Sequence, residues 1–159
     1  MFYQERIRIK IKKTSKDALI PMRANDTDSG YDLVAIDDGV VSSDGEYIEY
    51  DTGLQIQPAQ GFFTTIRPRS SITKYDLILK NSLGTIDESY TGNLKLRFAL
   101  SGRHADLNGN HHTYSVKTYK KGDKIGQLVV ERRIDADFDE VDSLEKTERG
   151  EGGFGSSGN

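Results

Sequence analysis

The 159-residue sequence contains no cysteine and no tryptophan, and only 35% of its residues are hydrophobic. Without a thiol, the chain can form no disulfide, perform no thiolate chemistry and offer no cysteine ligand to a zinc ion. The length predicts one domain, with some residues left for arms or tails. Because a modest apolar content gives a lone monomer a small core, we expect a compact fold that buries more surface by oligomerising.

The sequence also lacks an excess of positive charge and a long hydrophobic run. It contains 22 lysines and arginines and 25 aspartates and glutamates, which gives a net charge of −3. This balance argues against broad nucleic-acid binding, but it permits a locally basic pocket for a phosphorylated ligand. No stretch has the apolar length that crosses a bilayer, and the N-terminus does not resemble a signal peptide. We therefore expect a soluble, cytoplasmic protein, in the host cytoplasm if it is viral, that binds neither nucleic acid nor membrane.

Alternation of apolar and polar residues is the dominant pattern of the chain. Ile7, Ile9 and Ile11 are separated by basic residues, and residues 94–100 show the same alternation. Such alternation places the apolar side chains on one face of a β-strand. Further strands are predicted at 31–36, 47–50, 54–57, 61–67, 76–80, 113–119 and 124–132, with one short helix near 70–76. The sequence predicts an all-β fold, which would be an antiparallel sandwich, jelly roll or barrel.

Two segments depart from this pattern. Residues 101–116 are polar and long for a hairpin connection, which indicates an inserted loop, and we interpret its His104, His111 and His112 as surface residues. Residues 134–148 hold seven acidic residues and one lysine, which is typical of an extended connector. We divide the chain into a β domain (1–133), an acidic connector (134–148) and a glycine-rich C-terminal arm (149–159).

The arm has the sequence RGEGGFGSSGN and contains a GxGxxG match at Gly150, Gly152 and Gly155. A dinucleotide-binding loop of that pattern needs a following helix and an acidic residue about twenty positions further on. The sequence stops four residues after Gly155, so we do not expect such a loop. A glycine- and serine-rich terminus is commonly a solvated tail, whereas Arg149 and Phe154 favour a segment that wraps phosphates and stacks on a base.

Two upstream stretches combine polar groups with turn or helix signals. In RPRSS, Arg69, Ser70 and Ser71 offer a guanidinium group, hydroxyls and helix-start amides to an anion. The alternative is a serine helix cap beside a surface arginine. In GTIDESYTGN, Asp87 is either a turn residue or a carboxylate that orients and deprotonates water. Tyr90 in the same stretch would support a sugar ring or be an ordinary strand residue.

Carboxylates and one amide mark two further stretches. In DTDSGYDL, Asp26, Asp28 and Asp32 bring three carboxylates together, which suits Mg²⁺ bridged to substrate phosphates and equally suits an acidic turn. In GDKIGQLVVE, Gln127 is a polar residue in an otherwise apolar strand. A buried glutamine needs hydrogen-bond partners, so Gln127 is either structural or faces a ligand.

Taken together, these stretches resemble the five ordered motifs of the homotrimeric dUTP pyrophosphatases (dUTPases). The motifs are DSGYDL, PRSS, GTIDESYTGN, GDKIGQLV and TERGEGGFGSSG, and the match extends from about residue 24 to residue 158. The resemblance implies a jelly-roll-like β domain of the β-clip type, with one short helix, in homotrimers whose active sites lie at subunit interfaces. It also implies hydrolysis of dUTP to dUMP and pyrophosphate with Mg²⁺, which limits uracil incorporation into DNA and supplies dUMP for dTMP synthesis.

The resemblance assigns roles to individual residues. Asp87 would activate the water that attacks the α-phosphorus, and Asp32 would hold hydrated Mg²⁺ through water. The C-terminal arm would close over a neighbouring site, with Phe154 on the uracil. The implied substrate-binding residues are Arg69, Ser70, Ser71 and Gln127 at the phosphates, Asn81, Gly84 and Ile86 at the uracil, Tyr90 at the deoxyribose, and Arg149, Gly155, Ser156 and Ser157 around the γ-phosphate.

The sequence departs from the family pattern at three places. Ser71 stands where the family often has glycine, and Gly126 stands where it usually has alanine. The insertion at 101–116 has no counterpart in short family members and is either decoration or a contact surface for another protein.

Two other functions compete with dUTP hydrolysis. The related dCTP deaminases, including bifunctional members, carry a proton-transferring glutamate on the strand after the third motif. Arg97 stands roughly at that place here, and an arginine cannot act as an acid or base at neutral pH. The other alternative is a nucleotide-dependent binding module, or a dUTPase with an added regulatory role, that contacts a partner protein through the 101–116 loop.

Overall fold

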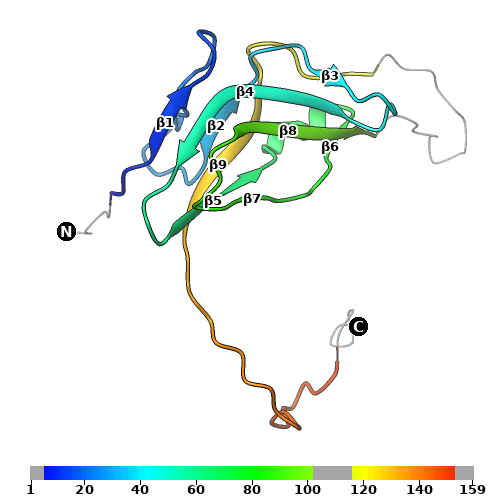
Figure 1. The fold of residues 1–159 in the computed structure, drawn as a ribbon. Coiled ribbons are helices and arrows are strands. Elements are labelled where there is room, and N and C mark those ends of the chain that lie inside the picture. The colour runs from blue at the N-terminus through cyan, green and yellow to red at the C-terminus, as the bar shows by residue number, and fades with distance from the viewer. Residues whose placement is uncertain (1–5, 102–115, 153–159) are drawn as a thin grey trace, which may run out of the picture.

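Two antiparallel sheets pack face to face, and an extended C-terminal segment leaves them (Figure 1). The computed structural model describes residues 6–101 and 116–152. The predicted all-β, jelly-roll-like fold class is confirmed. The elements are β1 (Lys10–Lys13), β2 (Tyr31–Val34), β3 (Val40–Val41), β4 (Ile48–Gln57), β5 (Phe62–Arg67), the 3₁₀-helix η1 (Ser70–Lys74), β6 (Leu77–Leu79), β7 (Gly84–Ile86), β8 (Asn93–Leu100) and β9 (Lys124–Arg132).

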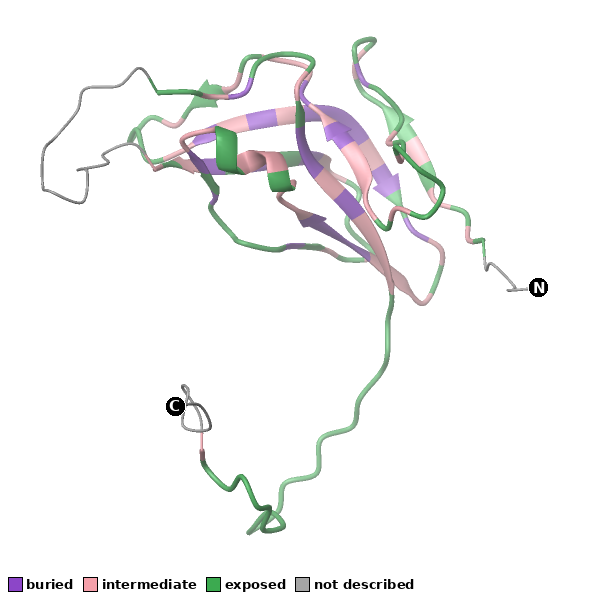
Figure 2. Ribbon diagram, turned by 180° about the vertical axis from the view of Figure 1, so that it is seen from behind, coloured by how far each residue is buried: buried purple, intermediate pink, exposed green. Residues whose placement is uncertain are grey.

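Each sheet turns one apolar face toward the other. One sheet has the strand order β1-β4-β8-β6, with β3 also paired to β4, and the other has the order β2-β9-β5-β7. In β8 the alternation places Leu94, Leu96 and Phe98 inside and leaves Lys95 and Arg97 on the outer face. The inner faces form one core, which is visible as the buried stretches in Figure 2. Among the described residues, no helix combines the length and the apolar character needed to span a bilayer.

The structure differs from the predicted strands in several places. Residues 7–9 precede β1, the predicted strands 47–50 and 54–57 form the single strand β4, and β3 was not predicted. Residues 84–86, predicted as a turn or hairpin tip, form β7 and pair with β5. The predicted strand at 113–119 is wrong for its described part, because residues 116–119 belong to no strand. That segment is fixed instead by Asp76, whose backbone amide donates to the Lys117 carbonyl (2.9 Å) and whose carboxylate accepts from the Lys117 amide (2.8 Å). The remainder of the inserted loop, with its three histidines, lies outside the described residues.

An aromatic cluster supports η1, the predicted short helix. Tyr119 is fully buried, and its ring lies 4.2 Å from that of Tyr75, 5.4 Å from that of Phe98 and 5.9 Å from that of Tyr50. Burial raises the pKa of the Tyr119 hydroxyl to about 12, so this side chain stays neutral in the core. Because Tyr75 directly follows η1, the cluster fixes the end of the segment that begins at Arg69.

Gly126 provides a test of the packing between the two sheets. A Cβ atom at this buried position would lie 2.6 Å from Cδ2 of Leu96 and 3.3 Å from the carbonyl oxygen of Arg67. We expect Gly126→Ala to lower the free energy of unfolding by about 1–3 kcal/mol through overpacking. Leu96→Val, which shortens the opposing side chain, should offset part of that loss in the double variant. Denaturant unfolding of the four proteins measures the coupling, and strictly additive losses would contradict the clash.

Candidate functional site

Three neighbouring strands bring the first predicted residues together. Gln127 of β9 pairs with Asp32 of β2 on one side and with Arg67 of β5 on the other. Pro68 and Arg69 directly follow β5, so they leave the sheet at the level of Gln127. Three sequence motifs that are far apart in the chain therefore meet at one end of this sheet.

Ion pairs connect these residues. The Arg69 Nε atom lies 2.8 Å from Asp32 Oδ1, and Lys124 Nζ lies 2.7 Å from Asp32 Oδ2. Nη1 of Arg69 also donates to Oγ of Ser71 (3.2 Å). We call Asp32, Arg69, Ser71, Lys124 and Gln127 the cationic group, because it contains two cations and one carboxylate. A net positive charge next to hydroxyl and amide groups suits a phosphorylated ligand.

Gln127 has a structural partner within this group. Its side-chain amide donates to the carbonyl oxygen of Pro68 (3.1 Å), which ties the chain after β5 to β9. The side chain needs the glycine at position 30, because a Cβ atom there would lie 2.1 Å from Gln127 Oε1. The SGYDL stretch thus leaves the space that the glutamine occupies.

The start of η1 rules out the serine-cap interpretation of RPRSS. The residue that precedes the helix is Arg69, and no side chain caps the first turn. Ser71 instead accepts the hydrogen bond from Arg69, while Ser70 is exposed and makes its backbone carbonyl available to Thr73 (3.0 Å). The Ser71 hydroxyl therefore lies beside the guanidinium group, and neither serine caps the helix.

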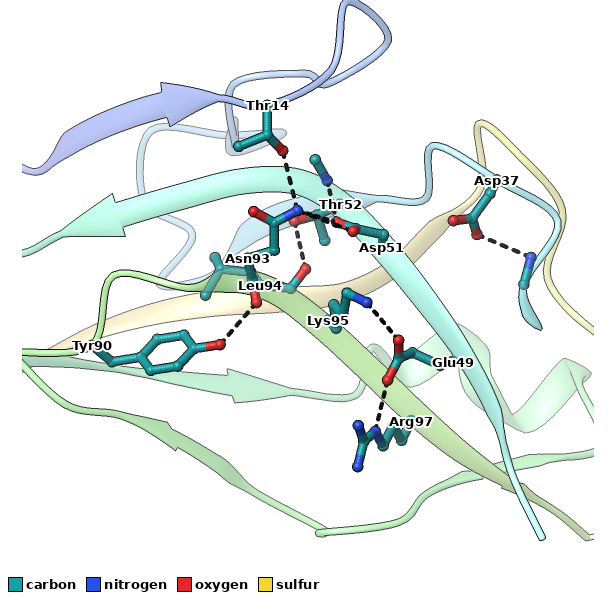
Figure 3. A network of polar contacts seen from close by, with 12 residues as sticks. Thr14, Asp37, Glu49, Asp51, Thr52, Tyr90, Asn93, Leu94, Lys95 and Arg97 are labelled. Carbon is teal, nitrogen blue, oxygen red and sulfur yellow. Dashed lines mark hydrogen bonds and ion pairs between the residues drawn. The ribbon is translucent and has the colours of Figure 1, made fainter. Parts of the chain in front are cut away.

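The second predicted set of residues surrounds a cavity. A space of about 600 Å³ beside β7 and β8 is lined by Asn81, Gly84, Ile86, Asp87 and Tyr90. Gly84 is buried, whereas the side chains of Asn81 and Tyr90 are exposed. The Tyr90 hydroxyl donates to the carbonyl oxygen of Asn93 (3.1 Å), which holds the ring over the start of β8 (Figure 3).

Asp87 lies at the edge of this cavity. Its carbonyl oxygen accepts a hydrogen bond from the Tyr90 amide (3.1 Å), so Asp87 is a turn residue, as one of the two sequence interpretations held. Its carboxylate is exposed and forms no ion pair or hydrogen bond with the described part of the chain. Asp87 also lines a second cavity of about 1050 Å³, together with Arg8, Lys10 and Arg133. The free carboxylate is available to a ligand or to water.

The wall of the smaller cavity contains charged residues that sequence reasoning missed. Glu49 of β4 accepts from Lys95 Nζ (2.7 Å) and from Arg97 Nε (2.8 Å), as Figure 3 shows. The hydrogen bond from Lys95, followed by that from Arg97, holds the pKa of Glu49 below its usual value. The guanidinium of Arg97 also lies 4.9 Å from the centre of the Tyr47 ring. The sequence predicted the outward direction of Lys95 and Arg97, but it gave no sign that Glu49 lies opposite them.

The remaining predicted residues are not joined to these two sets. Asp28 accepts hydrogen bonds from Asn25, which supports the acidic-turn interpretation of DTDSGYDL, and no group of three potential metal ligands occurs in 6–101 and 116–152. Arg149 is exposed and donates to the carbonyl oxygen of Gly152 (2.8 Å). No described hydrogen bond or ion pair links the cationic group to the residues around the cavity. Phe154, Gly155, Ser156 and Ser157 lie outside the described residues.

Comparisons of the sequence with known proteins agree with the order of the motifs. The family model for dUTPase matches residues 16–158. The chain belongs to the dUTPase family. The deoxyuridine 5'-triphosphate nucleotidohydrolase of Nautilia profundicola is 35% identical, over 96% of this chain and 99% of that protein. The enzyme of the same name from Thermobifida fusca is 37% identical, over 96% of this chain and 79% of that protein.

A solved structure shows the same fold. The dUTPase of Staphylococcus bacteriophage 80alpha with dUPNHPP superposes with a TM-score of 0.70, at 26% identity, over 96% of this chain and 99% of that chain. The family assignment that the motif order suggested is therefore confirmed.

The charged wall of the cavity predicts a pH effect on stability. Because the folded-state pKa of Glu49 lies below its ordinary value of 4.5, the ionised side chain stabilises the fold above that value. This contribution is lost as the pH falls through the folded-state pKa. We expect Glu49→Gln to narrow the difference between the thermal midpoints measured at about pH 7 and about pH 3. Glu46→Gln, at a more exposed carboxylate paired with Lys80, is the matched control, and an equal narrowing there would contradict the prediction.

Proposed function

We propose that the protein hydrolyses dUTP to dUMP and pyrophosphate. The proposal rests on one observation: a cavity of about 600 Å³ is lined by Asn81, residues 84–86 of β7 and Asp87, whose carboxylate has no described partner. Membership in the dUTPase family supports the same substrate. In this proposal Asn81, Gly84 and Ile86 bind the uracil, and Tyr90 packs against the deoxyribose.

Asp87 acts as the general base in this proposal. Its carboxylate accepts a proton from a water molecule as that water attacks the α-phosphorus. A new bond forms between the water oxygen and phosphorus, the bond from phosphorus to the bridging oxygen breaks, and pyrophosphate leaves. The absence of a described partner for the Asp87 carboxylate supports this role, since a carboxylate held by an arginine or lysine would be a weaker base.

The cationic group binds the triphosphate. Arg69 and Lys124 offset the phosphate charge, and Ser70, Ser71 and Gln127 provide hydrogen bonds to phosphate oxygens. Hydrated Mg²⁺ fits this donor set, because it commonly takes one carboxylate and fills its other positions with water and phosphate oxygens. Asp32 is the carboxylate that would hold it through water. When bound, the ion supplies further charge neutralisation at the phosphates.

A complete site requires more than one subunit in this proposal. Among the described residues, no hydrogen bond or ion pair joins the cationic group to the residues around the cavity, which supports a site whose phosphates and base are bound by different copies of the chain. We propose a homotrimer with active sites at the subunit interfaces. The C-terminal arm, including Arg149, closes over a site on a neighbouring subunit. Four exposed apolar residues on the acidic connector support such an assembly: Ile134, Phe138, Val141 and Leu144.

The observations disfavour deamination of dCTP. The only carboxylate described beside Arg97 is Glu49, which two cations keep ionised through the lowered pKa. A proton-transferring acid needs a pKa closer to the working pH. A protein-binding role for the 101–116 loop stays a prediction, because residues 102–115 lie outside the described part of the chain.

Substrate preference tests the proposed function. We expect pyrophosphate release in the presence of Mg²⁺ to be fastest with dUTP, compared with dCTP, dTTP and UTP. In this proposal residues 81–86 exclude a 5-methyl group on the base, and Tyr90 excludes a 2′-hydroxyl on the sugar. A preference for any other nucleotide in this panel would refute the assignment.

The role of Asp87 is tested by Asp87→Asn. The variant removes the proton acceptor and keeps the side-chain shape, so we expect kcat to fall by about 10²–10⁴ while dUTP binding persists. Single-turnover kinetics and calorimetric titration with a non-hydrolysable dUTP analogue separate the two effects. Near-normal turnover would show that Asp87 is not the base.

A further inference from the structure

Glu88, the residue next to Asp87, makes contacts that the reaction described above does not use. One carboxylate oxygen, Oε2, accepts from the backbone amide of Gly61 (3.2 Å) and from Nη1 of Arg133 (2.8 Å). The Arg133 backbone amide in turn donates to the carbonyl oxygen of Gly61 (2.8 Å). Glu88, Gly61 and Arg133 therefore form a closed set of three hydrogen bonds.

The sheet topology explains why these three residues meet. β5 lies between β7 and β9, Gly61 immediately precedes β5, and Arg133 immediately follows β9. Glu88 comes two residues after the end of β7, so its side chain reaches across the start of β5 to the end of β9. A single oxygen atom thus connects the ends of three neighbouring strands.

Arg133 is also where the C-terminal segment leaves the sandwich. Figure 1 shows the chain running away from the sheets directly after β9, and Figure 2 shows that this segment is exposed along its length. The Nε atom of Arg133 lies 3.2 Å from Asp135 Oδ1, so the ion pair continues into the acidic connector. The turn that carries Asp87 is therefore joined to the base of the segment that leads to the arm.

Stability alone is a poor explanation for this arrangement. The Glu88 and Arg133 side chains are 30% and 49% exposed, and partly exposed ion pairs contribute little to folding. The placement of Asp87 is a better explanation than stability. Among the described residues, nothing binds the Asp87 carboxylate, and the described backbone bond of Asp87 is the turn bond from the Tyr90 amide. A displacement of about 1 Å at a reacting group can reduce a rate by up to about 100-fold.

We propose that Glu88 is a positioning residue, which fixes the turn of Asp87 by bonding to Gly61 and Arg133. The inference rests on the proposed role of Asp87 as the base. The role proposed for Glu88 needs no contact with the substrate, because Gly61 and Arg133 both bond to its Oε2 atom. Arg133 in turn binds the Glu88 carboxylate at the point where the C-terminal segment begins.

Steady-state kinetics of the full chain with dUTP tests this role. We expect Glu88→Ala and Arg133→Met each to lower kcat about tenfold with KM changed less than about twofold, since the turn moves while the nucleoside cavity remains. The double variant should be no worse than the worse single variant, because both changes break the same contact. Arg133→Lys, which keeps a cation, should recover most of the activity.

Lys121→Met is the matched control. Lys121 forms a similarly exposed ion pair with Asp17 (2.6 Å) outside both groups of site residues, so its loss should leave kcat unchanged. Thermal midpoints are measured for every variant. An unchanged kcat in Glu88→Ala would overturn the inference. So would additive losses of kcat in the double variant, or losses of kcat that parallel the fall in thermal midpoint.

The same assay separates this inference from the proposed function. A wild-type chain that hydrolyses dUTP, an Asp87→Asn variant that does not, and fully active Glu88 variants would overturn the positioning role alone. A wild-type chain without dUTP hydrolysis, or an active Asp87→Asn variant, would overturn the proposed function and the positioning role with it.

Discussion

The pairing of β9 with both β2 and β5 is the constraint on which the other features depend. It places Gln127 beside Asp32 on one side and beside the strand that leads to Arg69 on the other. Each neighbour is antiparallel, so a shift of one residue in either register would turn Gln127 and its partners to opposite faces. This register is held in two ways. The glycine at position 30 leaves space for the Gln127 side chain, and the buried Ile125 and Leu128 fill the core.

The same strand separates two kinds of electrostatic environment. At its start, Lys124 and Arg69 hold the carboxylate of Asp32, which is only 15% exposed, so the polar groups are already oriented before a ligand arrives. Beyond its end, the Asp87 carboxylate has no described partner, and the neighbouring Glu88 bonds to Arg133. Fixed dipoles and charges cost no reorganisation when a phosphorylated ligand binds, whereas a base must stay unpaired to accept a proton. The fold thus keeps the binding cations and the free carboxylate on different elements.

Sequence reasoning predicted the elements whose alternation is enforced by burial. β8 and β9 follow the predicted ranges closely, because each has one face in the core. It failed for β7, whose three residues are too few to show a period, and for residues 116–119, where Tyr119 is buried without any strand. Apolar residues alone do not distinguish a strand from a loop that is anchored by one aromatic side chain.

The candidate site was predictable only where short motifs carry it. Asp87, Tyr90 and Arg69 stand in stretches that a reader of the sequence can single out. Lys124 stands in the quoted stretch GDKIGQLVVE without having been singled out, and Glu49 stands in no quoted stretch. The place of both in the site follows from contacts between strands that no local pattern encodes. The contact between Glu88 and Arg133 was equally hidden, because the two residues are 45 positions apart in the chain, although Glu88 lies in the quoted stretch GTIDESYTGN.

The acidic connector has a physical consequence of its own. Asp135, Asp137 and Asp139 alternate along an extended chain, which spaces their backbones roughly 7 Å apart. This spacing is shorter than the Debye length of about 8 Å at physiological ionic strength, so their mutual repulsion is only partly screened. Charged chains of this kind stretch when salt is dilute and contract when it is concentrated. We therefore expect the distance between the β sandwich and Arg149 to depend on the ionic strength of the solvent as well as on the protein.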